Sequence, residues 1–210
     1  MQSSKRIVAG VDEVGRGPLA GPVLACAFIM LAKLSLAKLR DSKHLSQRQR
    51  NEWYKFFKQH PDVAWGIGRV SERVIDRINI YEATQLAMER AVKNLEQKLH
   101  TSKLYRCTLL RDSTSHLKLL IIDGITKIKT TIPQQTVIKG DEQIALCAAA
   151  SIVAKVTRDR LMLRYHARYP MYRFDRHKGY GTQFHLEMLK KHGPCAIHRR
   201  TFAPMKLNNE

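Results

Sequence analysis

Residues 6–31 read RIVAGVDEVGRGPLAGPVLACAFIML, and two of the strands expected in this protein lie within them. Residues 6–11 and 22–31 are short apolar runs, which are typical of buried strands. The glycine-rich turn Gly15-Arg16-Gly17-Pro18 lies between the two runs. Asp12 and Glu13 therefore close the first predicted strand, at a place where the chain is about to turn.

The rest of the chain alternates between strand and helix patterns. Apolar runs predict three further strands, at residues 63–70, 117–122 and 136–138. Cap residues and apolar residues at helical spacing predict four helices, at residues 46–60, 82–99, 141–166 and 183–192. Residues 101–116 are polar and irregular, which is typical of a surface loop. Strands interspersed with helices indicate an α/β fold with a mixed five-stranded sheet.

The chain is strongly basic. It has 210 residues, with 37 Lys and Arg against 18 Asp and Glu, a net charge of +19. Such an excess repels itself in the folded state, and nucleic acid is the first partner expected because binding releases counterions from phosphates. An anionic membrane is the rival partner, but neither a basic amphipathic helix nor a lipid anchor is found. A generally basic, solvated surface is the plain alternative.

The cysteines and the N-terminal sequence indicate the compartment. Cys26, Cys107, Cys147 and Cys195 are far apart and form no CxxC pair, which excludes an ordinary zinc module and indicates reduced thiols. The first residues, MQSSKRIVAG, contain no apolar signal region, and no segment approaches the ~20 apolar residues of a membrane span. We therefore expect a cytoplasmic protein that is not exported.

Four carboxylates lie at the ends of predicted elements: Asp12, Glu13, Asp123 and Asp141. Loop edges can bring such side chains together from distant parts of the sequence. Because clustered carboxylates repel one another, a divalent cation is the natural means of holding them, and hard oxygen ligands favour Mg²⁺ or Mn²⁺. Two such ions on a phosphodiester would activate a water and stabilise the leaving 3′-oxygen.

Two of these carboxylates also have a structural explanation, and the other two are harder to explain that way. Asp141 has the position of a helix N-cap, and Asp123-Gly124 has the sequence of an ordinary turn. Asp12 and Glu13 are adjacent, so in a regular strand they point to opposite faces, and both can be ligands only if the strand breaks there. Asp159 is left out of the set, because ~27 Å of helix would separate it from Asp141; an ion pair with a neighbouring arginine is expected instead.

Eight motifs in this order resemble ribonuclease HII, the bacterial type 2 ribonuclease H. They are residues 12–22 (DEVGRGPLAGP), 41–43 (DSK), 78–80 (INI), 122–124 (IDG), 139–141 (KGD), 148–160 (AAASIVAKVTRDR), 177–182 (HKGYGT) and 198–202 (HRRTF). The related ribonuclease HIII group usually has another residue at the centre of the Gly-Arg-Gly motif and an extra N-terminal domain. Arg16 and the eleven residues before Asp12 therefore favour type 2.

The resemblance implies a ribonuclease H-like fold in one catalytic domain over residues 1–210, with residues 183–210 as a small C-terminal helical extension. It places the family's metal-binding acids on Asp12, Glu13, Asp123 and Asp141. It also places substrate contacts on Gly15, Arg16, Gly17 and Tyr180. Weaker candidates for phosphate contacts are Lys43, Lys178 and Arg158. His177, His198 and Arg199 are expected to be structural.

The implied activity is hydrolysis of the phosphodiester on the 5′ side of a ribonucleotide, in RNA–DNA hybrids or in duplex DNA. Mn²⁺ or Mg²⁺ would be the cofactor, and the products would carry 5′-phosphate and 3′-hydroxyl ends. The protein is expected to be a monomer that removes ribonucleotides from DNA. The alternatives are a non-catalytic basic module that binds nucleic acid and a related metal nuclease such as a junction resolvase.

Overall fold

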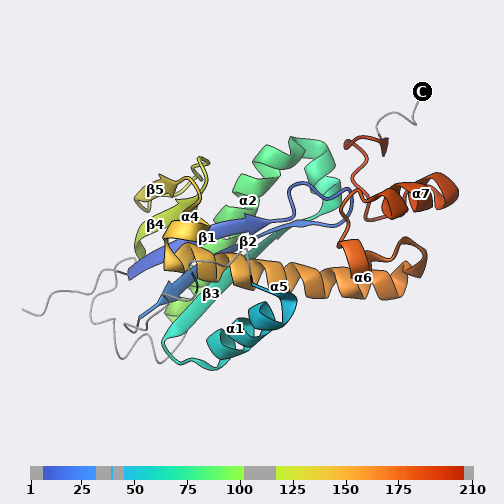
Figure 1. Cartoon of the computed structure of the whole chain (residues 1–210). Coiled ribbons are helices and arrows are strands. Elements are labelled where there is room, and N and C mark those ends of the chain that lie inside the picture. The colour runs from blue at the N-terminus through green and yellow to red at the C-terminus, as the bar shows by residue number, and fades with distance from the viewer. Residues whose placement is uncertain (1–6, 32–38, 40–44, 102–116, 206–210) are drawn as a thin grey trace, which may run out of the picture.

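The computed structural model describes residues 7–31, 39, 45–101 and 117–205. Its five-stranded sheet has the order β3-β2-β1-β4-β5 (Figure 1). The strands are β1 (Ile7–Val14), β2 (Val23–Met30), β3 (Val63–Val70), β4 (Leu117–Asp123) and β5 (Gln134–Val137). β2 pairs antiparallel with β1 and β3, whereas β4 pairs parallel with β1 and β5. The predicted mixed five-stranded sheet is confirmed.

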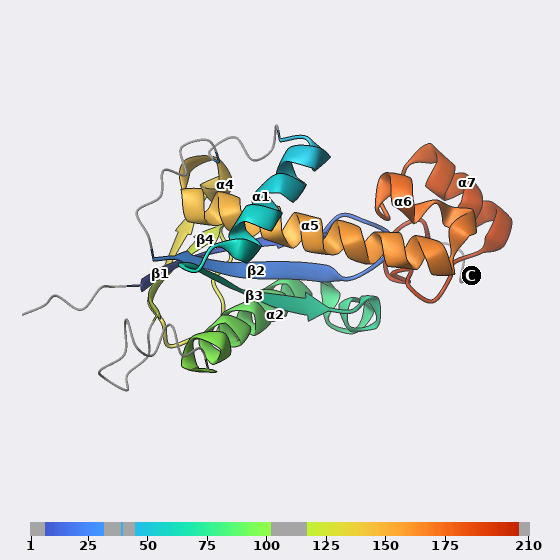
Figure 2. The same ribbon diagram turned by 90° about the horizontal axis from the view of Figure 1, so that it is seen from below.

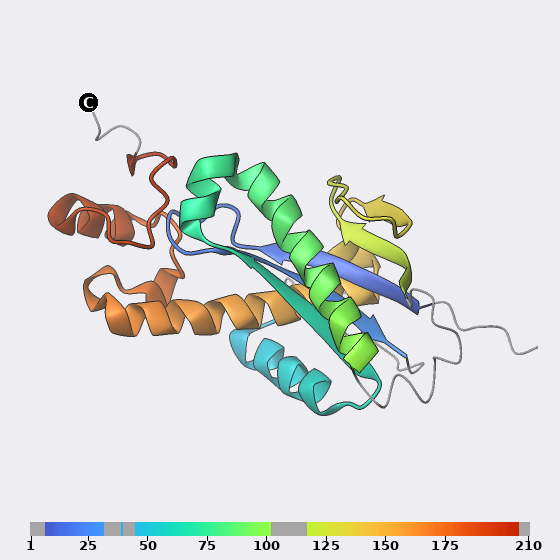
Figure 3. The ribbon, with the colours of Figure 1, turned by 180° about the vertical axis from the view of Figure 1, so that it is seen from behind.

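Helices cover both faces of this sheet. They are α1 (Gln47–Gln59), α2 (Glu72–Thr101), α4 (Gly140–Gln143), α5 (Ala145–Arg168), α6 (Phe174–His177) and α7 (Gln183–His192), with a 3₁₀ turn at Pro170–Tyr172. α2 lies on one face, and α1 and α5 lie on the other (Figures 2 and 3). None of the helices in the described ranges has the length and apolar character needed to span a membrane.

The strands bury both of their faces. In β1 and β2, Val11 and Ala25 belong to the cluster under α2, whereas Cys26 and Phe28 belong to the cluster under α5. This alternation follows from the two-residue period of a strand. It explains why β2 reads as a continuous apolar run and not as an alternating one.

Three element boundaries differ from the prediction. The helix expected at 141–166 is divided at Ile144, whose backbone is extended (φ −115°, ψ 112°). α2 begins at Glu72 and contains Asn79 with a non-helical backbone of positive φ (φ 66°, ψ 170°). The Asn79 side chain accepts hydrogen bonds from the N–H groups of Tyr81 and Glu82, so it caps the second part of α2. β1 continues to Val14, beyond both acids.

A separate apolar cluster lies at the C-terminal end of α5. Its buried members are Leu19, Ala20, Met162, Tyr172, Phe174, Leu189, Ile197 and Met205. The turn between β1 and β2 therefore packs against the predicted C-terminal extension, and this packing begins before residue 183. That residues 1–210 form one domain stays a prediction.

Candidate active site

The sheet places Asp12 beside Asp123. β1 and β4 run parallel, and Val11 is in register with Ile122. The acids that follow these residues therefore lie side by side at the carboxyl ends of two neighbouring strands. The Asp12 side chain is buried, with 5% of its surface exposed. Burial of a carboxylate without compensation is expensive, so this position indicates a specific role.

The short helix α4 brings the third acid to the same edge. The Gly140 N–H donates to Asp123 Oδ1 at 2.7 Å, which ties the first turn of α4 to the end of β4. Asp141 follows Gly140 and is buried. The N-cap of α4 is Lys139, in a left-handed conformation, so the N-cap explanation for Asp141 is wrong. Asp123 is the last residue of β4, before the bend at Gly124 (φ 89°).

The strand break that was predicted at Asp12-Glu13 is absent. β1 does not break at Asp12-Glu13; it runs to Val14, and the chain turns at Gly15 (φ 91°). Adjacent strand residues point to opposite faces of the sheet, so the Glu13 and Asp12 side chains leave β1 on different faces. Arg16 Nη1 lies 3.2 Å from Glu13 Oε1, an ion pair that connects the acid to the glycine-rich turn.

The charges of these acids act on one another. Burial raises the pKa of the Asp12 carboxyl well above its usual range, and the charges of Glu13 and Asp123 raise it further. Burial also raises the pKa of Glu13, which the Arg16 guanidinium opposes. Such repulsion between carboxylates is what a bound cation relieves.

A buried cysteine reports the same convergence. The pKa of the Cys147 thiol is raised to about 12, mainly by burial. Asp12, Asp123 and Asp141 all contribute to that rise. Three carboxylates that are widely separated in the sequence therefore share one neighbourhood under the N-terminal end of α5.

Ser151 belongs to this site and was missed by the sequence analysis. Its hydroxyl hydrogen-bonds to the Asp12 carboxylate, and the Glu13 N–H donates to Asp12 Oδ1 at 2.7 Å. These two donors orient the Asp12 side chain. The available signal was a single polar residue in the run AAASIVA, on a helix packed against the sheet.

The four acids do not form a complete metal-binding arrangement. Within the described residues, no three His, Cys, Asp or Glu side chains stand in an arrangement that would hold a metal ion as they are. The backbone brings the acids to one edge, and coordination of a metal ion by all of them would require rotation of their side chains.

The glycine-rich turn and Tyr180 lie together beside the acids. A Cβ atom on Gly17 would lie 3.7 Å from Tyr180 Cε1, which is ordinary contact. Tyr180, Arg16 and Gly17 are all exposed. Of the predicted substrate contacts, Arg16, Gly17 and Tyr180 therefore meet at one surface next to Glu13, whereas Gly15 is buried beneath it. The role of all four residues stays a prediction.

The structure contradicts the prediction of a phosphate contact for Arg158. Its side chain is completely buried, and its guanidinium donates to the carbonyl oxygens of Ala20, Pro22 and Lys178 at 3.0–3.2 Å. A phosphate cannot reach a guanidinium that is completely buried and bonded to three backbone carbonyls. The pKa of Arg158 is lowered by burial, which is the cost of this position.

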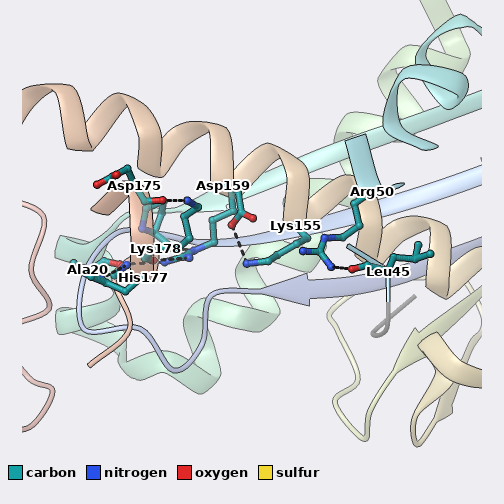
Figure 4. A network of polar contacts seen from close by, with 11 residues as sticks. Ala20, Leu45, Arg50, Lys155, Asp159, Asp175, His177 and Lys178 are labelled. Atoms are coloured by element: carbon teal, nitrogen blue, oxygen red, sulfur yellow. Dashed lines mark hydrogen bonds and ion pairs between the residues drawn. The ribbon is translucent and has the colours of Figure 1, made fainter. Parts of the chain in front are cut away.

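The two remaining residues predicted to contact phosphate are lysines. Lys178 is partly buried, and its ammonium donates to the Asp175 carbonyl oxygen (Figure 4). A phosphate contact by Lys178 has to compete with this bond. Lys43 lies outside the described residues.

Asp159 forms the structural ion pair that was expected of it, with a different partner. Its carboxylate lies 2.8 Å from Lys155 Nζ, one helical turn earlier on α5, and not against Arg158 or Arg160 (Figure 4). Ser151 is eight residues away on the same helix, a separation of about 12 Å at 1.5 Å per residue. Asp159 is therefore not part of the acidic group.

Two buried histidines fix the loop that carries Tyr180. The Cys195 N–H donates to His198 Nδ1 at 2.9 Å, so His198 carries its proton on Nε2. His198 Nε2 lies 3.0 Å from His185 Nε2, and His185 Nδ1 lies 2.8 Å from the Tyr180 carbonyl oxygen. This chain of hydrogen bonds needs both rings to be neutral. The expectation that His198 is structural agrees with this geometry.

Acid should weaken this part of the molecule. Burial lowers the pKa of His185 to about 4 and that of His198 to about 3, against 6.5 for an exposed histidine. The unfolded state therefore takes up more protons than the folded state below pH 6.5. The two neutral histidines contribute fully to the free energy of unfolding above that pH, and their contribution is lost as the pH falls towards 3. Between pH 7.5 and 5 we expect a loss of up to about 2 kcal/mol per histidine.

Urea unfolding at the two pH values measures this loss. Substitution of both histidines by Asn should flatten the pH dependence, whereas His192→Asn, on the exposed surface of α7, should leave it unchanged. Equal pH dependence in the double variant and the wild type would contradict the assignment.

Known proteins resemble this chain over nearly its whole length. The family model for Ribonuclease HII matches residues 9–205. A ribonuclease HII from Bacillus velezensis is 47% identical over 201 residues, which are 96% of this chain and 71% of that protein. A ribonuclease HII from Chlamydia caviae is 46% identical over 200 residues, which are 95% of this chain and 85% of that protein.

Solved structures confirm the ribonuclease H-like fold. The crystal structure of ribonuclease H2 from Pyrococcus horikoshii OT3 superposes with a TM-score of 0.70 at 23% identity, over 96% of each chain. Bst-RNase HIII in complex with Mn²⁺ gives a TM-score of 0.70 at 17% identity, over 98% of this chain and 70% of that one. The sequence matches go further than the fold: the chain belongs to the ribonuclease HII family, metal-dependent endoribonucleases that cleave RNA in RNA–DNA hybrids and at ribonucleotides embedded in DNA.

Proposed function

We propose that Asp12, Glu13, Asp123 and Asp141 hold two divalent cations, Mg²⁺ or Mn²⁺, and that the protein cuts the phosphodiester on the 5′ side of a ribonucleotide. The products carry 5′-phosphate and 3′-hydroxyl ends. The observation that supports this most is the pairing of parallel strands β1 and β4, which sets Asp12 beside Asp123 and next to α4.

The donor set suits these ions. All four side chains are carboxylates, the hard oxygen ligands that Mg²⁺ and Mn²⁺ prefer. The raised pKa values of Asp12 and Glu13 reflect crowded negative charge, which a cation offsets. Bst-RNase HIII, which shares the fold, was solved with Mn²⁺. When bound, the ions supply an activated water and neutralise the leaving oxygen.

The chain's own groups orient this site. Ser151 and the Glu13 N–H hold the Asp12 carboxylate, and the Gly140 N–H holds that of Asp123. Because these donors are fixed by α5, β1 and α4, the acids need little reorganisation beyond rotation of their ends. Such preorganisation is what makes electrostatic catalysis effective.

The neighbouring surface binds the substrate. The Arg16-Gly17 backbone is exposed and open to a close approach, and the exposed Tyr180 ring offers a flat face to a sugar or a base. A 2′-hydroxyl beside this backbone distinguishes a ribonucleotide from a deoxyribonucleotide. The net charge of +19 attracts the polyanion.

A duplex with a single embedded ribonucleotide tests the activity. With Mn²⁺ or Mg²⁺ we expect one cut on its 5′ side, and EDTA should abolish it, because the carboxylates then lack their cations. An all-DNA duplex of the same sequence and a four-way DNA junction should stay intact. No cut in the ribonucleotide duplex, or a cut that persists in EDTA, would contradict the proposal.

We also propose that the protein acts as a monomer in the cytoplasm, where it removes ribonucleotides from DNA. All the acids and the substrate-contact surface come from one chain, which supports the monomer. Light scattering on the purified protein tests it.

A further inference from the structure

The turn between β1 and β2 is held from inside by Arg199. Its guanidinium donates three hydrogen bonds, to the carbonyl oxygens of Gly15 (2.5 Å), Arg16 (2.7 Å) and Gly21 (2.9 Å). The side chain is completely buried. Arg199 comes from the segment after α7 and is 178 to 184 residues from these three partners in sequence. Figure 1 shows the red C-terminal segment beside the blue turn.

These bonds set the direction of two peptide planes. In a planar trans peptide the C=O of one residue and the N–H of the next point in opposite directions. With the carbonyls of Gly15 and Arg16 turned inward to Arg199, the N–H groups of Arg16 and Gly17 turn outward. In the described ranges neither N–H has a hydrogen-bond acceptor. Both residues are exposed, and Gly17 lies beside the Tyr180 ring.

A buried guanidinium is an unusual way to attach one segment to another. Burial, with the positive charge of Arg158 nearby, lowers the pKa of Arg199 to about 9. No carboxylate of the described residues forms an ion pair with it. Apolar side chains often replace buried charges without loss of stability. What apolar groups cannot supply is a rigid plane of donors that fixes several carbonyls at once.

We propose that Arg199 is a positioning residue for substrate recognition. Its guanidinium holds the Gly15-Arg16-Gly17 backbone so that the N–H groups of Arg16 and Gly17 face the ribonucleotide as a pair of donors. Arg199 does not touch the substrate. The inference rests on the proposed function, because it assigns the geometry of that surface to a residue far from it in sequence.

Two substitutions of Arg199 and two matched controls test the proposal. Arg199→Met keeps much of the volume and removes all donors, and Arg199→Lys keeps the charge with donors that do not lie in a plane. Arg200→Met and Arg200→Lys make the same changes at the next residue, which is exposed. For a duplex with one ribonucleotide, kcat/KM should fall on the order of 100-fold in Arg199→Met. Arg199→Lys should be intermediate, and both controls should stay within a few-fold of the wild type.

Binding without cleavage separates positioning from a merely structural role. In EDTA, the dissociation constants of the wild type and the variants are measured for the ribonucleotide duplex and for the same duplex in all-DNA form. In Arg199→Met, the ratio of the dissociation constants for the all-DNA duplex and the ribonucleotide duplex should fall about tenfold, which corresponds to one or two hydrogen bonds. The affinity for the all-DNA duplex should stay unchanged. Mn²⁺ binding, measured by calorimetry, should stay unchanged.

Three results would overturn the inference: an unchanged preference, an equal loss of affinity for both duplexes, or kinetics like those of the Arg200 variants. If Arg199→Met does not fold, Arg199→Lys carries the same comparison. Failure of the wild type to cut the ribonucleotide duplex would instead overturn the proposed function, so the two failures are distinguishable.

Discussion

Asp12→Asn is expected to lower kcat on a ribonucleotide-containing duplex on the order of 1000-fold, because it removes a central carboxylate from the acidic group. Asp12 neighbours Glu13 and Asp123 and is held by Ser151. Asn has the same shape and can still accept these bonds, but it lacks the charge that a divalent cation needs. The substitution also removes repulsion at a buried site, so the fold should be retained.

The decisive comparison is between activity and binding. Affinity of Asp12→Asn for the hybrid should stay within a few-fold of the wild type, since the basic surface is unchanged. Asp159→Asn is the matched control: it makes the same chemical change on α5, in the ion pair with Lys155, outside the acidic group. Its kcat should stay within a few-fold of the wild type. Comparable losses in both variants would remove the distinction between the two acids.

Gly68→Ala should destabilise the protein by about 3 kcal/mol, the upper part of the range for overpacking. A Cβ atom at this position would lie 1.8 Å from the Ala87 carbonyl oxygen and 2.6 Å from the Ala91 backbone nitrogen. Both atoms belong to the backbone of α2, which cannot rotate away as a side chain can. Accommodation therefore requires α2 to move away from β3 and opens the cluster beneath it.

Urea unfolding of the metal-free protein measures this effect. Gly17→Ala is the control, since its Cβ would meet Tyr180 only at 3.7 Å, and its unfolding free energy should change by less than about 0.5 kcal/mol. An unfolding midpoint of Gly68→Ala equal to that of the control would contradict the close packing of α2 on β3.

Much of this architecture was predictable because the signals are local. The apolar runs of β2 and β3 and the helical spacing within α2 depend only on neighbouring residues. In the same way, the apolar run of β4 places Asp123 at its end. Boundaries were less predictable. The division at Ile144 and the continuation of β1 to Val14 depend on tertiary packing and strand pairing, which short sequence patterns do not contain.

The buried polar groups show the same limit. In the sequence Arg158 is one of 37 basic residues, and nothing local separates it from a surface phosphate ligand. Only the packing of the C-terminal segment against the turn after β1 surrounds it with carbonyl oxygens. Ser151 was missed for the same reason: its partner, Asp12, is distant in the chain and adjacent only in the fold.

The sequence by itself determined the α/β class, the basic character and the choice of four acids as candidate ligands, because composition and short-range patterns carry this information. The tertiary structure alone decided that these ends coincide, through the parallel register of β1 and β4. It also turned Arg158 and Arg199 inward, since burial and hydrogen-bond geometry arise from contacts between residues that the chain keeps far apart.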